Sequence, residues 1–164
     1  MQRRLPMLSV AAAVVVAGVS ACGGSDESAD SASEAVTTQV QEICDGLALS
    51  FADRGEFPVE DFDPEDPDAR DLPGVGDYFA AGLDELPRAV AELETISATG
   101  ELREQLDTLM EAWGAEGANA RVQVDAALAA DVDAFVATLD TAAASKEAST
   151  EAASALGVPD CAQG

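Results

Sequence analysis

The sequence predicts an all-α protein whose folded domain is a four-helix up-and-down bundle. Apolar residues recur at three- and four-residue steps through most of the chain from residue 34 onward, which is the spacing of one helix face. Alanine, the residue with the highest helix propensity, is abundant. Apart from one long acidic loop, the periodic segments are joined by short connections, and these favour antiparallel neighbours in a bundle.

The first predicted helix covers residues 34–53, where Val36, Val40 and Leu47 lie on one face. The period is lost over residues 54–73. Prolines recur in that segment, and acidic residues outnumber basic ones. We expect it to be a loop.

The second predicted helix opens at Gly76 or Asp77 and stops near Gly100. Pro87 lies inside it, and an internal proline removes one backbone donor and clashes with the carbonyl four residues earlier. We therefore expect a kink or a short break after Leu86.

The third and fourth predicted helices follow the same rules. The third runs over residues 101–128 and is weakened by Gly114 and Gly117, where we expect a bend. Asp131 is the expected N-cap of the fourth helix because its carboxylate can accept from the free amides of the first turn. Gly157 is its expected C-terminal stop.

Residues 1–21 have the layout of a secretory signal. A short basic segment containing Arg3 and Arg4 precedes an apolar run over residues 5–19, whose densest part is too short to span a bilayer permanently. We expect this segment to be cleaved. The arginine pair leaves open whether export uses the general secretory or the twin-arginine route.

The end of that signal, Val19-Ser20-Ala21-Cys22, resembles the lipobox of bacterial lipoproteins. The resemblance implies cleavage after Ala21, a diacylglyceryl group on the Cys22 sulfur, and anchorage at the outer face of the bacterial cytoplasmic membrane. An ordinary signal peptide cut at the same place, which would leave Cys22 as a free thiol, is the alternative.

Residues 22–33 contain no large apolar side chain, so we expect a lipidated flexible tether. The helical bundle domain is then predicted to comprise residues 34–164.

Once Cys22 is assigned to lipid, Cys44 and Cys161 are the two remaining cysteines. An even pair outside the cytoplasm favours a disulfide, here between residues 117 positions apart (161 minus 44). A redox-active thiol would need a close partner or a basic neighbour to lower its pKa, and the sequence offers neither.

The formal charge limits the classes of partner that we expect for this chain. Removal of the signal leaves six basic residues against 32 acidic ones, a charge of −26. Nucleic acid and anionic lipid surfaces would both repel such a chain, so the membrane would be held through the lipid on Cys22. The acidity either attracts cations or basic cell-wall ligands or forms a solvated surface.

A broader resemblance rests on the lipobox, the early Cys44 and the terminal pattern from Ala152 to Cys161. Together these are similar to a diffuse group of small actinobacterial lipoproteins of uncharacterised function. The resemblance implies location and fold, and it supplies no catalytic residues.

The sequence offers little for catalysis. It contains no histidine, which removes the serine-histidine triads and histidine metal ligands. Gly74-Val75-Gly76 lacks the third glycine and the preceding strand of a phosphate-binding loop. We therefore expect no enzyme activity and no cofactor.

Two segments are candidate ligand sites. In the acidic loop 56–71, Asp61, Asp63 and Glu65 are weak candidates for calcium, because carboxylates on irregular backbone suit that ion. The spacing is wrong for an EF-hand, and a solvated loop is the alternative. The other candidate is a pocket lined by Trp113, Tyr78 and the phenylalanines, against the alternative that these rings fill the core.

We therefore expect a non-catalytic lipoprotein of the cell envelope that binds a protein or cell-wall partner. The alternative is a binder of a small ligand or of calcium through the acidic loop. A protein-interaction module should expose a contiguous apolar patch, whereas a small-ligand binder should contain a cavity near Trp113.

Overall fold

The computed structural model describes residues 26–162, and helices are the only regular elements in that part of the chain. The predicted signal peptide 1–21 and the predicted lipid site Cys22 lie outside the described residues. The elements in order are α1 (Asp26–Ala52), α2 (Leu72–Ala80), α3 (Glu85–Leu93), α4 (Glu101–Leu128), α5 (Val132–Ala155) and the 3-10 helix η1 (Pro159–Ala162).

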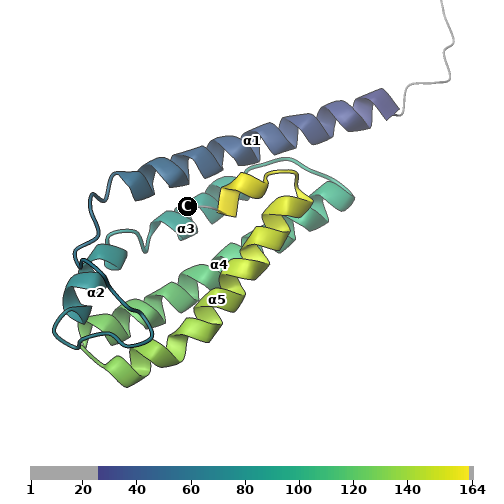
Figure 1. Ribbon diagram of the computed structural model, residues 1–164. Helices are drawn as coiled ribbons and strands as arrows, with labels where there is room; N and C mark the ends of the chain where they lie inside the picture. Colours follow the sequence, from purple (N-terminus) through teal and green to yellow (C-terminus); the bar gives the residue numbers. More distant parts are fainter. Residues whose placement is uncertain (1–25, 163–164) are drawn as a thin grey trace, which may run out of the picture.

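The helices form an all-α bundle, as predicted. The chain reverses direction from α1 to α3, from α3 to α4 and from α4 to α5 (Figure 1). α4 and α5 make the most extensive contact, α2 and α3 pack on α4, and α1 packs on α3 and η1. The bundle is therefore closed between its first and last long helices by η1.

The core has two parts. The larger part joins α1, α3, α4 and the end of α5 around residues such as Val40, Leu93, Leu106 and Leu109, each fully buried. The smaller part lies around Leu72, Ala126, Ala127 and Phe135, at the opposite end of the bundle.

α1 begins at Asp26, eight residues before the predicted start at Glu34. Residues 26–33 were expected to belong to a flexible tether, and they are helical instead. The physical reason is that a helix, once formed, extends more easily than a new one starts. Once residues 36–51 are fixed by packing, each further residue adds a backbone hydrogen bond without a new nucleation step, and alanine favours the extension.

The predicted second helix is divided into α2 and α3, and the break lies at residues 81–84 rather than after Leu86. The ring of Pro87 would clash with a helical carbonyl at Leu83, so the interruption has to precede the proline. Pro87 lies in the first turn of α3, where its missing amide leaves no hydrogen bond unmade. Likewise Pro73 lies in the first turn of α2, which begins inside the predicted loop.

α4 matches the predicted bounds and runs without interruption past Gly114 and Gly117. The N-cap prediction for α5 is confirmed: the Asp131 carboxylate accepts from the Ala134 amide at 3.0 Å. Gly157 follows the helix with a φ of 78°, the left-handed conformation expected of a glycine stop.

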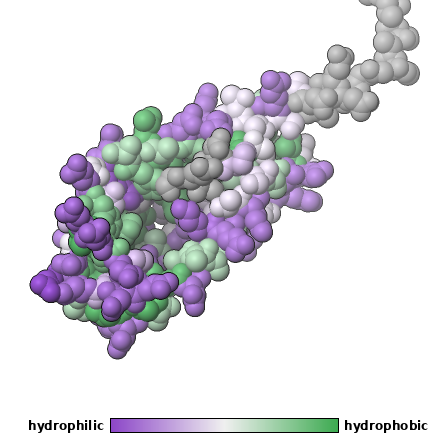
Figure 2. Space-filling view, viewed as in Figure 1, coloured by the Kyte–Doolittle hydropathy of each residue, from purple (hydrophilic) through white to green (hydrophobic). Residues whose placement is uncertain are grey.

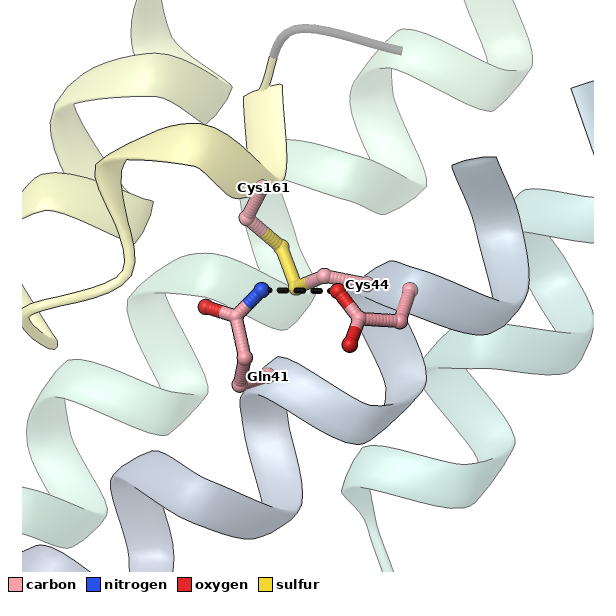
Figure 3. The surroundings of a disulfide bond; sticks show 4 residues. Gln41, Cys44 and Cys161 are labelled. Atoms are coloured by element: carbon pink, nitrogen blue, oxygen red, sulfur yellow. Dashed lines mark hydrogen bonds between the residues drawn. A yellow bond between two sulfur atoms is a disulfide. The ribbon is translucent and has the colours of Figure 1, made fainter. Parts of the chain in front are cut away.

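Cys44 of α1 and Cys161 of η1 form a disulfide with Cα atoms 5.0 Å apart, as predicted (Figure 3). On the same side of α1, Gln41 donates to Asp45 at 2.9 Å, one turn along the helix. Thr37 donates to the carbonyl of Leu156 at 3.2 Å. The segment that follows α5 is therefore joined to α1 by both a covalent bond and a hydrogen bond.

Within residues 26–162, none of the helices combines the length and the apolar character needed to cross a bilayer. Hydrophilic side chains cover much of the face seen in Figure 2, with apolar patches between them.

Candidate functional site

A cavity of about 430 Å³ lies between α1, the α2–α3 turn, α4 and α5. Its volume is within the range of about 300 to 1,000 Å³ that is usual for small-molecule sites. Most of its wall is apolar or aromatic, and the larger side chains of this kind are Leu47, Phe51, Tyr78, Phe79, Leu83, Leu86 and Trp113.

The cavity follows from the way in which the bundle is closed. η1 and the Cys44–Cys161 disulfide connect α1 to the end of α5, and both cysteines belong to the cavity lining. Further along, α1 packs on α3, while α5 packs on α4. The helix faces that meet across this space carry small residues such as Ala120 and Ala142, so side chains do not fill it.

Arg54 lies just beyond the end of α1 and lines the cavity. Its guanidinium carbon is 4.1 Å from the centroid of the Phe51 ring, a cation–π contact. Its Nε atom is buried without a hydrogen-bond partner among the described residues. Burial lowers the pKa of the guanidinium, while Tyr78 and Glu85 act in the opposite direction.

Gly82, in the turn between α2 and α3, lies against the same guanidinium. A Cβ atom on this residue would overlap all three terminal atoms of the Arg54 side chain. The position therefore accommodates the arginine because it has no side chain.

Arg54 and Lys146 differ from the other described basic residues in their ion pairing. Six basic side chains lie in the part of the chain that the structure describes. Arg54 and Lys146 form no ion pair there, and both line the cavity. The other four pair with carboxylates: Arg70 with Asp68, Arg88 with Glu85 and Glu92, Arg103 with Asp107, and Arg121 with Asp84 at 3.2 Å.

Two buried serines of α5 also belong to the lining. Ser145 donates to the carbonyl of Ala142 at 2.9 Å. The hydroxyl of Ser149 is buried and has no partner among residues 26–162. The wall at this point thus contains an unpaired polar atom.

The structure brings together only part of the predicted aromatic pocket. Trp113, Tyr78, Phe51 and Phe79 line the cavity. The other three phenylalanines lie outside it: Phe57, Phe62 and Phe135 form a chain of ring contacts at 5.6 and 6.1 Å beside α2 and α5.

Sequence reasoning did not identify Arg54, Lys146 or Gly82. For Arg54 and Lys146, the one signal in the sequence was their positive charge, because basic residues are rare in this chain. Nothing in the order of the residues indicates that Gly82, 28 positions after Arg54, lies against it.

The structure does not assemble the weak calcium candidates Asp61, Asp63 and Glu65. Over residues 26–162, no three cysteine or acidic side chains are placed to hold a metal ion together. Asp63 instead accepts from the backbone amide of Glu65 at 3.0 Å, a local turn contact. Elsewhere in the loop, Arg70 hydrogen-bonds Asp68 and lowers the pKa of that exposed carboxyl from 3.8 to about 2.

Comparison of the chain with protein-family models, with curated proteins and with solved structures finds no match.

Proposed function

We propose that the protein is a lipid-anchored, extracytoplasmic binding protein that holds a small, largely apolar ligand in the cavity between α1, α4 and α5. The observation that carries this proposal is the cavity of about 430 Å³, whose wall is mainly aromatic and aliphatic. Such a composition is typical of small-molecule sites. The lipobox that ends at Cys22 supports the location of the protein.

The exposed apolar residues also favour a ligand over a protein partner. The exposed residue Leu49 belongs to α1, whereas Val122 and the partly exposed Leu128 belong to α4, and α1 packs mainly on α3 and η1 instead of α4. These residues are therefore spread over two helices that are not main packing partners. In contrast, Phe57 and Phe79 lie together, with ring centroids 6.0 Å apart, and Phe79 belongs to the cavity lining. The aromatic surface that reaches solvent there is next to the cavity.

Trp113 provides a direct test because it is the single tryptophan of the chain and lines the cavity. A neutral apolar fluorophore, phenylnaphthylamine, is titrated into the mature chain carrying Cys22→Ala, which needs no detergent. We expect saturable binding of one probe per chain, with energy transfer from Trp113. The variant Ala142→Phe should weaken binding at least about tenfold, because the new ring fills the cavity.

The matched control is Ala143→Phe, which places the same ring on the next residue of α5, at an exposed position outside the lining. Circular dichroism establishes that both variants are folded. Absence of probe binding to the parent chain, or equal loss in the two variants, would contradict the proposal.

A further inference from the structure

The cavity has a charge opposite in sign to that of the whole protein. The chain carries a net charge of −24, yet the ionisable lining residues include two cations, Arg54 and Lys146, and one carboxylate, Glu116. With 32 acidic residues in the chain, a site lined without selection would be acidic. The residues that line the cavity therefore carry one more positive than negative charge, although the protein as a whole is strongly acidic.

Arg54 has no counter-ion of its own. Burial lowers its pKa, and the one carboxylate that acts against this effect, Glu85, accepts a hydrogen bond from Arg88. A cation that has lost part of its hydration and has no ionic partner destabilises the protein, and an anion that binds beside it removes this cost. The buried Nε atom of Arg54 has no hydrogen-bond partner among the described residues.

The guanidinium is also fixed in position. The Phe51 ring lies on one side of it at 4.1 Å, and Gly82 leaves room for it on another. A side chain that is held before binding loses little conformational entropy when the ligand arrives, so each of its hydrogen bonds contributes more to affinity. The planar guanidinium is well suited to a carboxylate or a similar planar or tetrahedral anion.

We propose that the ligand is an apolar small molecule with one anionic head group, which pairs with Arg54 while its apolar body lies against Trp113, Phe51 and Leu86. Lys146 adds long-range attraction for the same charge. This inference rests on the proposed function of the cavity and specifies the chemical class of its ligand.

The test compares two probes of nearly the same shape. Anilinonaphthalene sulfonate has the ring system of phenylnaphthylamine and adds one negative charge. We expect the anionic probe to bind the Cys22→Ala chain at least about tenfold more tightly than the neutral one, the effect of one charge-assisted hydrogen bond. This comparison needs no substitution in the cavity.

Three variants test whether Arg54 causes the preference for the anionic probe. Arg54→Gln should weaken binding of the anionic probe about tenfold more than binding of the neutral probe, because only the anionic probe loses its ionic partner. Arg70→Gln changes the net charge equally but removes an exposed arginine outside the lining, so both probes should bind it as they bind the parent. Gly82→Ala keeps the arginine but displaces its guanidinium, and it should reproduce the selective loss.

The outcomes separate the two proposals. If neither probe binds, the proposed function fails. If the neutral probe binds as tightly as the anionic one, or if Arg54→Gln and Arg70→Gln weaken the anionic probe equally, the cavity binds ligands and the inference about their charge is overturned.

Discussion

Ser145 and Ser149 lie one turn apart on α5, and both are buried in the wall of the cavity. Their hydroxyl groups differ in hydrogen bonding. Ser145 donates to a backbone carbonyl of its own helix, whereas Ser149 has no partner among the described residues. A buried hydroxyl without a hydrogen bond costs about 1 to 3 kcal/mol in desolvation. A binding site is a common place for such a cost, because residues that serve a ligand are not selected for stability alone.

Ser149→Ala is therefore expected to raise the free energy of unfolding by about 1 kcal/mol, since it removes an unpaired polar atom and adds a better helix former. The measurement is urea denaturation followed by circular dichroism. Ser145→Ala is the control, and it should be neutral or destabilising because it loses a hydrogen bond. A Ser149→Ala variant at least as destabilised as Ser145→Ala would show that the Ser149 hydroxyl is satisfied in solution.

α1 is the element on which the site depends. It contributes Leu47 and Phe51 to the cavity wall, yet it packs mainly on α3 and η1. Its link to η1 is the Cys44–Cys161 disulfide, which closes a loop of 117 residues. Loop-closure entropy for such a length amounts to about 4 to 5 kcal/mol as an upper figure. The disulfide thus stabilises the position of one whole wall.

We predict that the double variant Cys44→Ser, Cys161→Ser loses about 2 to 5 kcal/mol of unfolding free energy. It should also bind the neutral apolar probe more weakly, because α1 is no longer held over the cavity. Urea denaturation and probe titration measure the two effects, and a reducing agent should change the parent but not the variant. Equal denaturation midpoints for parent and variant would mean that packing alone holds α1.

At the scale of the whole molecule, charge and anchorage act together. In the proposed lipoprotein, the mature chain would carry a charge of −26 and be repelled by anionic lipid, so the lipid on Cys22 would hold it at the membrane. In the proposed lipoprotein, only residues 23–25 separate the lipidated Cys22 from the start of α1 at Asp26. The domain would then lie nearer the bilayer than the predicted tether of residues 22–33 allows.

Intact mass spectrometry of the protein extracted from its native membrane tests this arrangement. We expect the mass of residues 22–164 plus a diacylglyceryl group, increasing by two hydrogens on reduction of the disulfide. The Cys22→Ala chain is the control for the lipid. A mature chain without added lipid would show that the segment ending at Ala21 is an ordinary signal and that Cys22 is a free thiol.

Much of the secondary structure follows from local sequence. The predicted third helix has the bounds of α4, Asp131 caps α5, and Gly157 follows its end. These features depend on neighbouring residues, because helix periodicity and capping act within one or two turns. The disulfide was also predictable, since an exported chain with Cys22 assigned to lipid has two cysteines left.

Some local predictions failed because contacts distant in sequence decided them. The early start of α1 depends on packing further along the helix, which fixes the turns from which it extends. Pro87 correctly predicted that the second helix is interrupted. The interruption lies at residues 81–84, about one turn before the predicted position.

The sequence by itself determined that the domain is helical, where α4 begins and ends, how α5 is capped and that Cys44 pairs with Cys161. The tertiary structure alone decided that a cavity remains between the helices, that Arg54 and Lys146 both line it, and that Gly82 lies against Arg54. Periodicity identifies the apolar face of each helix but not the distance between two facing helices. An unfilled volume remains where the side chains between two helices occupy less space than the helices leave between them. Such a volume is therefore defined only once the helices are packed.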